Sequence, residues 1–205
     1  MAIENGVLVE YTGTAADVIV PNGIRKIWKS AFEGCSSLTS ITLPEGLVSI
    51  GEDAFYGCSG LTGITLPNSV ESIGSHAFSG CGNLKNIVLP SGLRKIDNGT
   101  FYDCSSLEGI ILPSGLEEIS GGAFYGCGSL ENILLPERVN NIRKNPFTSC
   151  SRLSSIDVVE GNEDYVSYEG CLYTKDRTVL IACPGGKKSV VIPESVTKIG
   201  TQYQI

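Results

Sequence analysis

Cysteines are the residues of this sequence whose type and spacing most suggest chemistry. Six of the eight recur at an interval of 23 residues: Cys35, Cys58, Cys81, Cys104, Cys127 and Cys150. If successive copies stack about 4.8 Å apart, as neighbouring strands do, their Cα separation would suit a disulfide. Side chains in the same place of every copy nevertheless point the same way, and zinc sites usually draw ligands from close sequence pairs. We therefore expect buried thiols that behave as small apolar side chains, with no metal and no cofactor.

Two further cysteines, Cys171 and Cys183, lie outside this series and flank an expected β-hairpin. If Leu172 pairs with Leu180, Cys171 lies beside Ile181 and not opposite Cys183. A disulfide between the two cysteines stays an alternative, and the pattern favours two free thiols.

The remaining candidates for chemistry are isolated. His76 is the only histidine, and no second histidine or nucleophile shares its place in the period, so we expect a surface residue and no general base. Asn98-Gly99-Thr100 matches the N-glycosylation pattern. Thr100 stands where other copies bury alanine, so we expect that site to be hidden. The sequence thus predicts no catalytic residue and a protein that is not an enzyme.

Two other residue types share the interval of the cysteines. Proline recurs at Pro21, Pro44, Pro67, Pro90, Pro113 and Pro136, and phenylalanine at Phe32, Phe55, Phe78, Phe101, Phe124 and Phe147. A fixed period of 20–50 residues is typical of solenoids, in which each repeat is one supersecondary unit stacked on the next. The sequence predicts one elongated, β-rich domain of 23-residue repeats.

Each repeat contains three parts. The first is Leu-x-x-Ile-x-Leu-Pro, as from Leu61 to Pro67, and its alternating apolar residues predict a strand with one buried face that ends at the proline. The second is a short extended piece such as Leu47 to Ile50. The third is Ala-Phe-x-x-Cys, whose spacing of three favours one short helical turn with both side chains inside.

These patterns divide the single domain, residues 1–205, into four parts. Residues 1–20 predict an N-terminal β cap, with Asn5-Gly6 at the turn of a hairpin. Residues 21–159 form six 23-residue repeats. The register breaks after Val159, and residues 160–188 predict an inserted β-hairpin block. Residues 189–205 begin a further, incomplete repeat.

Composition limits the classes of function. Apolar residues make up 41% of the 205 residues and charged residues 18%, with a net charge of −7. No basic cluster suggests nucleic-acid binding, and no apolar run approaches the roughly 18 residues of a membrane span. The first residues carry neither the basic nor the apolar region of a signal peptide. That fits a cytosolic protein or a segment of a longer exported one.

The predicted strands leave one surface column open to solvent. Between the two buried residues of each strand, one side chain must point outward: Thr42, Thr65, Val88, Ile111, Leu134 and Asp157. The preceding outward position is small or polar, and includes Asn86 and Asn132. Val88, Ile111 and Leu134 would form an apolar stripe about 10 Å long, and such a patch with a polar rim is typical of a partner site. The alternative is that β-branched residues simply favour strands.

The full pattern resembles the BspA-type leucine-rich repeat of bacterial surface proteins. It reads Leu-x-x-Ile-x-Leu-Pro-x-x-Val-x-x-Ile-Gly-x-x-Ala-Phe-x-x-Cys and covers about residues 18–200. The inserted Tyr-x-Gly-x-Leu-Tyr-x-Lys-Asp-x-Thr-x-Leu-Ile block is similar to one that recurs in that family. The resemblance implies a leucine-rich-repeat solenoid, a right-handed superhelix with a parallel sheet on its concave face. It also implies exported or wall-attached proteins, and it transfers no catalytic residue.

Together with the outward column, this resemblance favours a non-enzymatic protein-protein interaction or adhesion module of a bacterial cell-surface or secreted protein. The resemblance implies a partner on the surface of a host or neighbouring cell, which we expect to be held on the concave β-sheet by the outward column and by Asn86 and Asn132. We expect a monomer that binds no nucleic acid and does not insert into a membrane. The alternatives are a structural spacer domain in a larger surface protein and a carbohydrate-binding module.

Overall fold

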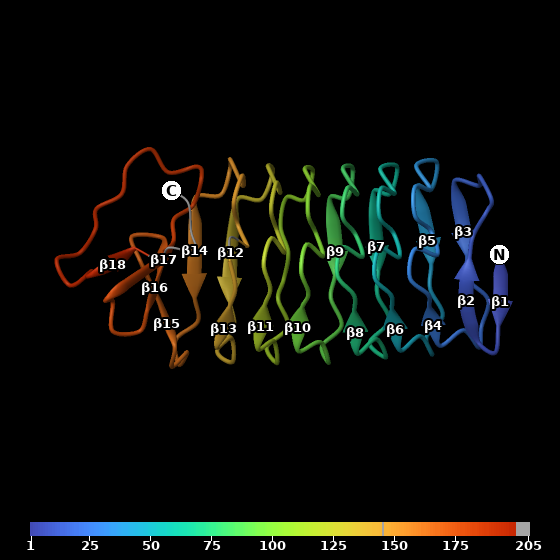
Figure 1. Cartoon of the computed structure of the whole chain (residues 1–205), viewed down its shortest axis with the longest axis horizontal. Coiled ribbons are helices and arrows are strands. Elements are labelled where there is room, and N and C mark those ends of the chain that lie inside the picture. Colours follow the sequence, from blue (N-terminus) through green and yellow to red (C-terminus); the bar gives the residue numbers. More distant parts are fainter. Residues whose placement is uncertain (145, 200–205) are drawn as a thin grey trace.

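The computed structural model describes residues 1–144 and 146–199 of the chain. Within these residues the backbone forms strands β1 to β18 and no helix. The rungs stack side by side along one long axis, from the N-terminal strands at one end to β15–β18 at the other (Figure 1). The predicted β-solenoid is thus confirmed.

The first-sheet strands come from the first part of each repeat, and all except the last precede a repeated proline. They are β3 (Asp17–Ile19), β5 (Ser40–Thr42), β7 (Gly63–Thr65), β9 (Asn86–Val88), β12 (Asn132–Leu135) and β14 (Ser155–Val158). They pair in parallel with partners 23 residues apart, such as Ile64 with Ile87. The rung between β9 and β12 contributes only a bridge, between Val88 and Ile111. The predicted parallel sheet therefore exists as three strand pairs and not as one continuous ladder.

The second sheet consists mainly of two-residue strands. They are β4 (Lys26–Ile27), β6 (Ser49–Ile50), β8 (Ser72–Ile73), β10 (Lys95–Ile96), β11 (Glu118–Ile119) and β13 (Asn141–Ile142), paired in parallel within β4–β8 and within β10–β13. At the N-terminal end β1 (Ala2–Glu4) pairs with β2 (Val7–Glu10) as an antiparallel hairpin, and β2 continues this sheet. Asn5 and Gly6 have φ of 48° and 77°, as the predicted Asn-Gly turn requires.

The Ala-Phe-x-x-Cys segments form hydrogen-bonded turns where the sequence suggested helical turns. In one rung the Cys58 amide donates to the Phe55 carbonyl, at 3.1 Å, within the rung. The Phe55 amide instead donates to the Ala77 carbonyl of the next rung, at 2.8 Å. Amides thus alternate between bonds within a rung and bonds between rungs, whereas a helix would require all of them to bond locally. Competition from the neighbouring rung explains why no helix forms.

The core runs through the middle of the stack as columns of identical residues. Consecutive phenylalanines from Phe32 to Phe147 are buried and stacked, with ring centroids 5.0–5.8 Å apart. The repeated apolar positions of both sheets, up to β14, are buried around them, apart from Ile110 and Val158, which are half-buried. Each rung therefore fills its interior against a copy of itself.

The inserted block is a small antiparallel sheet. It contains β15 (Tyr165–Tyr168), β16 (Cys171–Thr174) and β17 (Val179–Ala182), and β18 (Lys198–Ile199) pairs in parallel with β17. The predicted hairpin is present as β16–β17. Residues 200–205 of the predicted incomplete repeat lie outside the described residues, so the proposed domain boundaries stay a prediction.

The predicted register of this hairpin is wrong. Leu172 lies opposite Ala182, Tyr173 lies opposite Leu180, and the register shifts between the two pairs. The extra residue lets both Ile181 and Ala182 pack into the main core, while Leu180 packs with Cys171 and Tyr173 in a second cluster. Cys171 is therefore set against Cys183 and not beside Ile181.

A buried asparagine closes the column of second-sheet apolar residues. Asn162 follows Val139 by one period of 23 residues and is fully buried. Its Nδ2 donates to the carbonyls of Pro136 (3.0 Å) and Val139 (2.9 Å), and its Oδ1 accepts from the amides of Asp164 and Tyr165. This one side chain joins the last regular rung to the inserted block.

Replacing Asn162 by alanine should lower the free energy of unfolding by about 2–4 kcal/mol, because buried backbone groups lose their partners. Urea unfolding followed by circular dichroism measures this. Asn140→Ala is the matched control, since its side chain is exposed, and it should change stability by less than about 0.5 kcal/mol. Equal effects of the two substitutions would show that Asn162 is not the join.

Candidate functional site

The first sheet presents the apolar stripe that the sequence predicts. Val88, Ile111 and Leu134 are 62%, 87% and 54% exposed, while the Ile87 and Ile133 side chains that alternate with them are buried. Thr42 and Thr65 precede the stripe in the same column and Asp157 follows it, and all three are exposed. The orientation of the strands is therefore the one expected. Three large apolar side chains thus occupy consecutive rungs of this face, and a backbone bridge links two of them, Val88 and Ile111.

Polar groups and a groove border this stripe. Asn86 and Asn132 occupy the preceding outward position and are exposed. A groove of about 590 Å³ lies over β5, β7 and β9 and reaches Val88 from the N-terminal side. On the other side, Asp157 accepts hydrogen bonds from Ser155 (2.7 Å) and Ser167 (3.5 Å). The stripe thus has a hollow at one end and a fixed carboxylate at the other.

One member of this column was missed by the sequence reasoning. Ile19 in β3 lies one period before Thr42 and is 74% exposed. The 23-residue interval could have found it, but the segment had been assigned to the cap. Ile19 is separated from Val88 by two threonines, so the column has one continuous apolar stretch and one outlier.

The phased cysteines are donors to the backbone of the preceding rung. The Sγ atoms of Cys58, Cys81, Cys104, Cys127 and Cys150 donate to the carbonyls of Phe32, Phe55, Phe78, Phe101 and Phe124 at 3.0–3.2 Å. All five are free and buried, as predicted, while Cys35 in the first rung is half-buried. Burial raises the pKa of Cys58 and of Cys150 to about 12. These thiols stay protonated and are poor nucleophiles or metal ligands.

The isolated candidates assemble no reactive group. His76, which we expected on the surface, is half-buried beside Tyr102, with ring centroids 6.4 Å apart. Thr100 is buried and donates to the Asp97 carbonyl, as expected, whereas the Asn98 side chain of the glycosylation motif is exposed. Within residues 1–144 and 146–199, no three His, Cys, Asp or Glu side chains gather as metal ligands. No helix there is long and apolar enough to cross a membrane.

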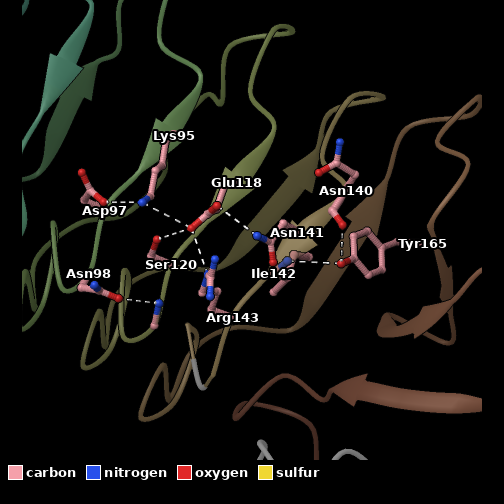
Figure 2. A network of polar contacts seen from close by, with 11 residues as sticks. Lys95, Asp97, Asn98, Glu118, Ser120, Asn140, Asn141, Ile142, Arg143 and Tyr165 are labelled. Atoms are coloured by element: carbon pink, nitrogen blue, oxygen red, sulfur yellow. Dashed lines mark hydrogen bonds and ion pairs between the residues drawn. The ribbon is translucent and has the colours of Figure 1, made fainter.

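Charged residues of the second sheet form a network across three rungs (Figure 2). Glu118 lies between Lys95 (3.4 Å) and Arg143 (3.1 Å), and it accepts further bonds from Ser120 and Asn141. Partial burial alone would raise the pKa of Glu118, but the bonds from Ser120 and Arg143 and the charge of Lys95 outweigh it and lower the pKa. These ion pairs and hydrogen bonds link the rungs of β10, β11 and β13 to one another.

Comparison with known proteins connects this geometry to a family. Residues 10–105 and 73–174 match the model of the BspA type leucine rich repeat region, in 6 copies. A comparison with curated proteins found no match.

Solved structures share the fold. A leucine rich cell surface protein from Faecalibacterium prausnitzii A2-165 is 27% identical, with a TM-score of 0.72 over 94% of this chain and 61% of that one. The pneumococcal vaccine antigen PcpA is 29% identical, with a TM-score of 0.57 over 90% and 41%. A leucine rich repeat protein of T. pallidum is 32% identical, with a TM-score of 0.51 over 73% and 62%. The chain spans less than two thirds of the length of each.

The buried thiols predict how stability depends on pH. Unfolded thiols ionise near pH 9, whereas Cys58 in the folded chain keeps its proton to about pH 12. Between these values the unfolded state binds fewer protons, so stability falls as pH rises, by about 1.4 kcal/mol per pH unit for each such thiol. Cys58→Ala should make the decline in the free energy of unfolding shallower by about that amount.

Urea unfolding between about pH 9 and pH 11 measures this slope. Cys35→Ala is the control, because Cys35 is half-buried and its removal should change the slope less. A Cys58→Ala slope equal to that of the unaltered chain would contradict the buried-donor assignment.

Proposed function

Because the chain belongs to the BspA-type leucine-rich repeat family, we propose that it is a non-enzymatic protein-protein interaction module that acts in adhesion. It works as part of a bacterial cell-surface or secreted protein, as the description of the F. prausnitzii structure as a cell surface protein suggests. Its partner is a protein on the surface of a host or neighbouring cell. The chain acts as a monomer, and residues 1–205 form one domain.

The observation that carries this proposal is the exposed stripe of Val88, Ile111 and Leu134. A solenoid that served only as a spacer would not be stabilised by large apolar side chains exposed to solvent. Exposed apolar patches with a polar rim are instead typical of partner sites. The strands beneath are held by hydrogen bonds between rungs. A partner that docks there orders little additional backbone, which lowers the entropic cost of binding.

The contact surface extends along the whole outward column. The stripe provides its apolar centre, and polar residues surround it: Thr42, Thr65, Asn86, Asn132 and Asp157. Apolar residues at the centre with hydrogen-bonding groups at the rim are the usual arrangement of a protein interface. The partner should therefore offer an apolar surface bordered by hydrogen-bond donors, one of which meets the Asp157 carboxylate.

Enzymatic treatment of target cells distinguishes the proposed adhesion module from a carbohydrate-binding module and from a spacer. Fluorescently labelled chain is applied to epithelial or bacterial cells that are untreated, treated with protease, or treated with glycosidases. An adhesion module with a protein partner loses binding after protease treatment only. A carbohydrate-binding module loses it after glycosidase treatment, and a spacer binds none of the cells.

Ile111→Asp tests the site itself. The side chain is 87% exposed, so the free energy of unfolding should change by less than about 0.5 kcal/mol. A charge in the centre of an apolar contact should weaken binding to protein-bearing cells at least tenfold, or about 1.4 kcal/mol. Binding isotherms on the same cells measure the affinity.

The matched control is Tyr56→Asp, which places the same charge on an exposed aromatic residue of the turn side. It should leave binding unchanged. If Ile111→Asp binds as well as the unaltered chain while remaining folded, the partner does not use the stripe.

A further inference from the structure

Cys171 and Cys183 are brought together by the end of the β16–β17 pair. Leu172 lies opposite Ala182 in this antiparallel ladder, so the next residues outward, Cys171 and Cys183, face each other. Cys171 is buried in the cluster with Tyr173 and Leu180, and the half-buried Cys183 packs against that cluster. Both are free thiols. This juxtaposition depends on the shifted register of the hairpin.

The two thiols interact with each other, unlike the phased cysteines, which donate to backbone carbonyls. Interaction with the Cys171 thiol lowers the pKa of Cys183, and the nearby Lys187 ammonium adds to the decrease against the opposing effect of burial. Interaction with Cys183 and burial raise the pKa of Cys171, and the Glu169 carboxylate adds to the rise. The ionised form is therefore favoured at Cys183.

Access to the pair is also unequal. A pocket of about 400 Å³ between the last rung and the inserted block is lined by Cys183 together with Phe147, Leu180, Pro184 and Lys187. Cys171 is fully buried behind it. Tyr173 lies in the same cluster, and its hydroxyl is buried with no hydrogen-bond partner among the described residues. A small molecule that enters this pocket meets the Cys183 sulfur first.

We propose that Cys171 and Cys183 form a redox-active dithiol that is modified by thiol–disulfide exchange with small-molecule disulfides, with Cys183 as the attacking thiol and Cys171 as the resolving one. Reactive thiolates lie beside a cation and are partly exposed, and in this chain Cys183 has both properties.

The chemistry balances in two exchanges. The Cys183 thiolate attacks one sulfur of the small disulfide, that S–S bond breaks, and one small thiolate leaves and takes a proton from solvent. Cys171 then loses its proton to solvent and attacks the Cys183 sulfur of the mixed disulfide, and the second small thiolate leaves. Two protein thiols are oxidised by two electrons, and one small disulfide is reduced to two thiols.

The bond would fix the inserted block where it joins the solenoid. The loop after Cys183 is attached to the last rung, since the Gly186 amide donates to the Leu153 carbonyl at 2.8 Å. A covalent link between Cys171 and Cys183 would therefore tie β16 to a loop already docked on the array. Oxidation would strengthen this join without touching the phased thiols.

The test begins with the fully reduced chain, freed of reductant and exposed to oxidised glutathione under native conditions. Remaining thiols are then alkylated in denaturant, and the peptides are identified by mass spectrometry. The expected product is a Cys171–Cys183 linked peptide pair, with loss of two hydrogen atoms, while the six phased cysteines are alkylated. Dithiothreitol should reverse it. Absence of this linkage, or linkage among the phased cysteines, would overturn the proposal.

Two variants separate the roles of the thiols. Cys171→Ser should stop at a stable glutathione adduct on Cys183, because nothing resolves it. Cys183→Ser should form adducts on Cys171 at least about tenfold more slowly, since that thiol is buried and protonated. Cys35→Ser should form the bridge at the unaltered rate, and circular dichroism checks that each variant is folded. Equal adduct formation by the Cys171→Ser and Cys183→Ser variants would contradict the assignment of roles.

Discussion

Every rung of this protein must fit on top of a copy of itself, and the hydrogen bonds between consecutive Ala-Phe-x-x-Cys turns set that fit. Phenylalanine amides donate to the next rung at 2.8–2.9 Å from Phe32 through Phe124. With the backbone held at this spacing, the phenylalanine rings can only stack face to face, as their 3–13° interplanar angles show. The position beside each ring has room only for a small side chain. Cysteine fits there, and its thiol, a weak hydrogen-bond donor, donates to a backbone carbonyl of the preceding rung. The turn thus explains two of the three repeated residue types.

The same constraint acts on the buried positions of each rung and leaves the exposed positions free to vary. Residues inside the stack must repeat, because a different shape would leave a cavity or an overlap against both neighbours. Residues that point out of the first sheet carry no such requirement, and they do vary: the column contains threonine, valine, isoleucine, leucine and aspartate. Variation at exposed positions on a repeating scaffold is what a recognition surface needs. The charged network around Glu118 shows a different use of a varied surface, in which the side chains hold rungs together.

The repeating part of the molecule could be predicted from the sequence because successive copies of the repeat show the same pattern. Each inference therefore rests on several copies and not on one. Which face of each strand is buried follows from alternation alone, and the exposure of Ile111 agrees with it. The turn conformation could not be derived from a spacing of three, because that spacing fits both a helical turn and a turn whose amides alternate. Only the neighbouring rung decides between them, and its hydrogen bonds are long-range.

The inserted block was harder because nothing in it repeats. Its hairpin was predicted from turn residues and apolar runs, but the register depends on whether Ile181 and Ala182 both reach the main core. A single extra residue changes which cysteines meet. The role of Asn162 could not be predicted for the same reason. Its place in the period is apolar in the regular repeats, and the four backbone groups that its side chain bonds come from both sides of the join.

Nearest-neighbour stacking is the central claim, and a double-mutant cycle on the phenylalanine column tests it directly. Phe78 and Phe101 are stacked at 5.7 Å, whereas Phe55 and Phe101 are two rungs apart. Leucine substitutions, singly and in pairs, give the coupling energy from urea unfolding. The account predicts a coupling of about 0.5–1.5 kcal/mol for Phe78 with Phe101 and none beyond about 0.3–0.5 kcal/mol for Phe55 with Phe101. Equal coupling for the two pairs would contradict a structure in which each rung is held by its immediate neighbours.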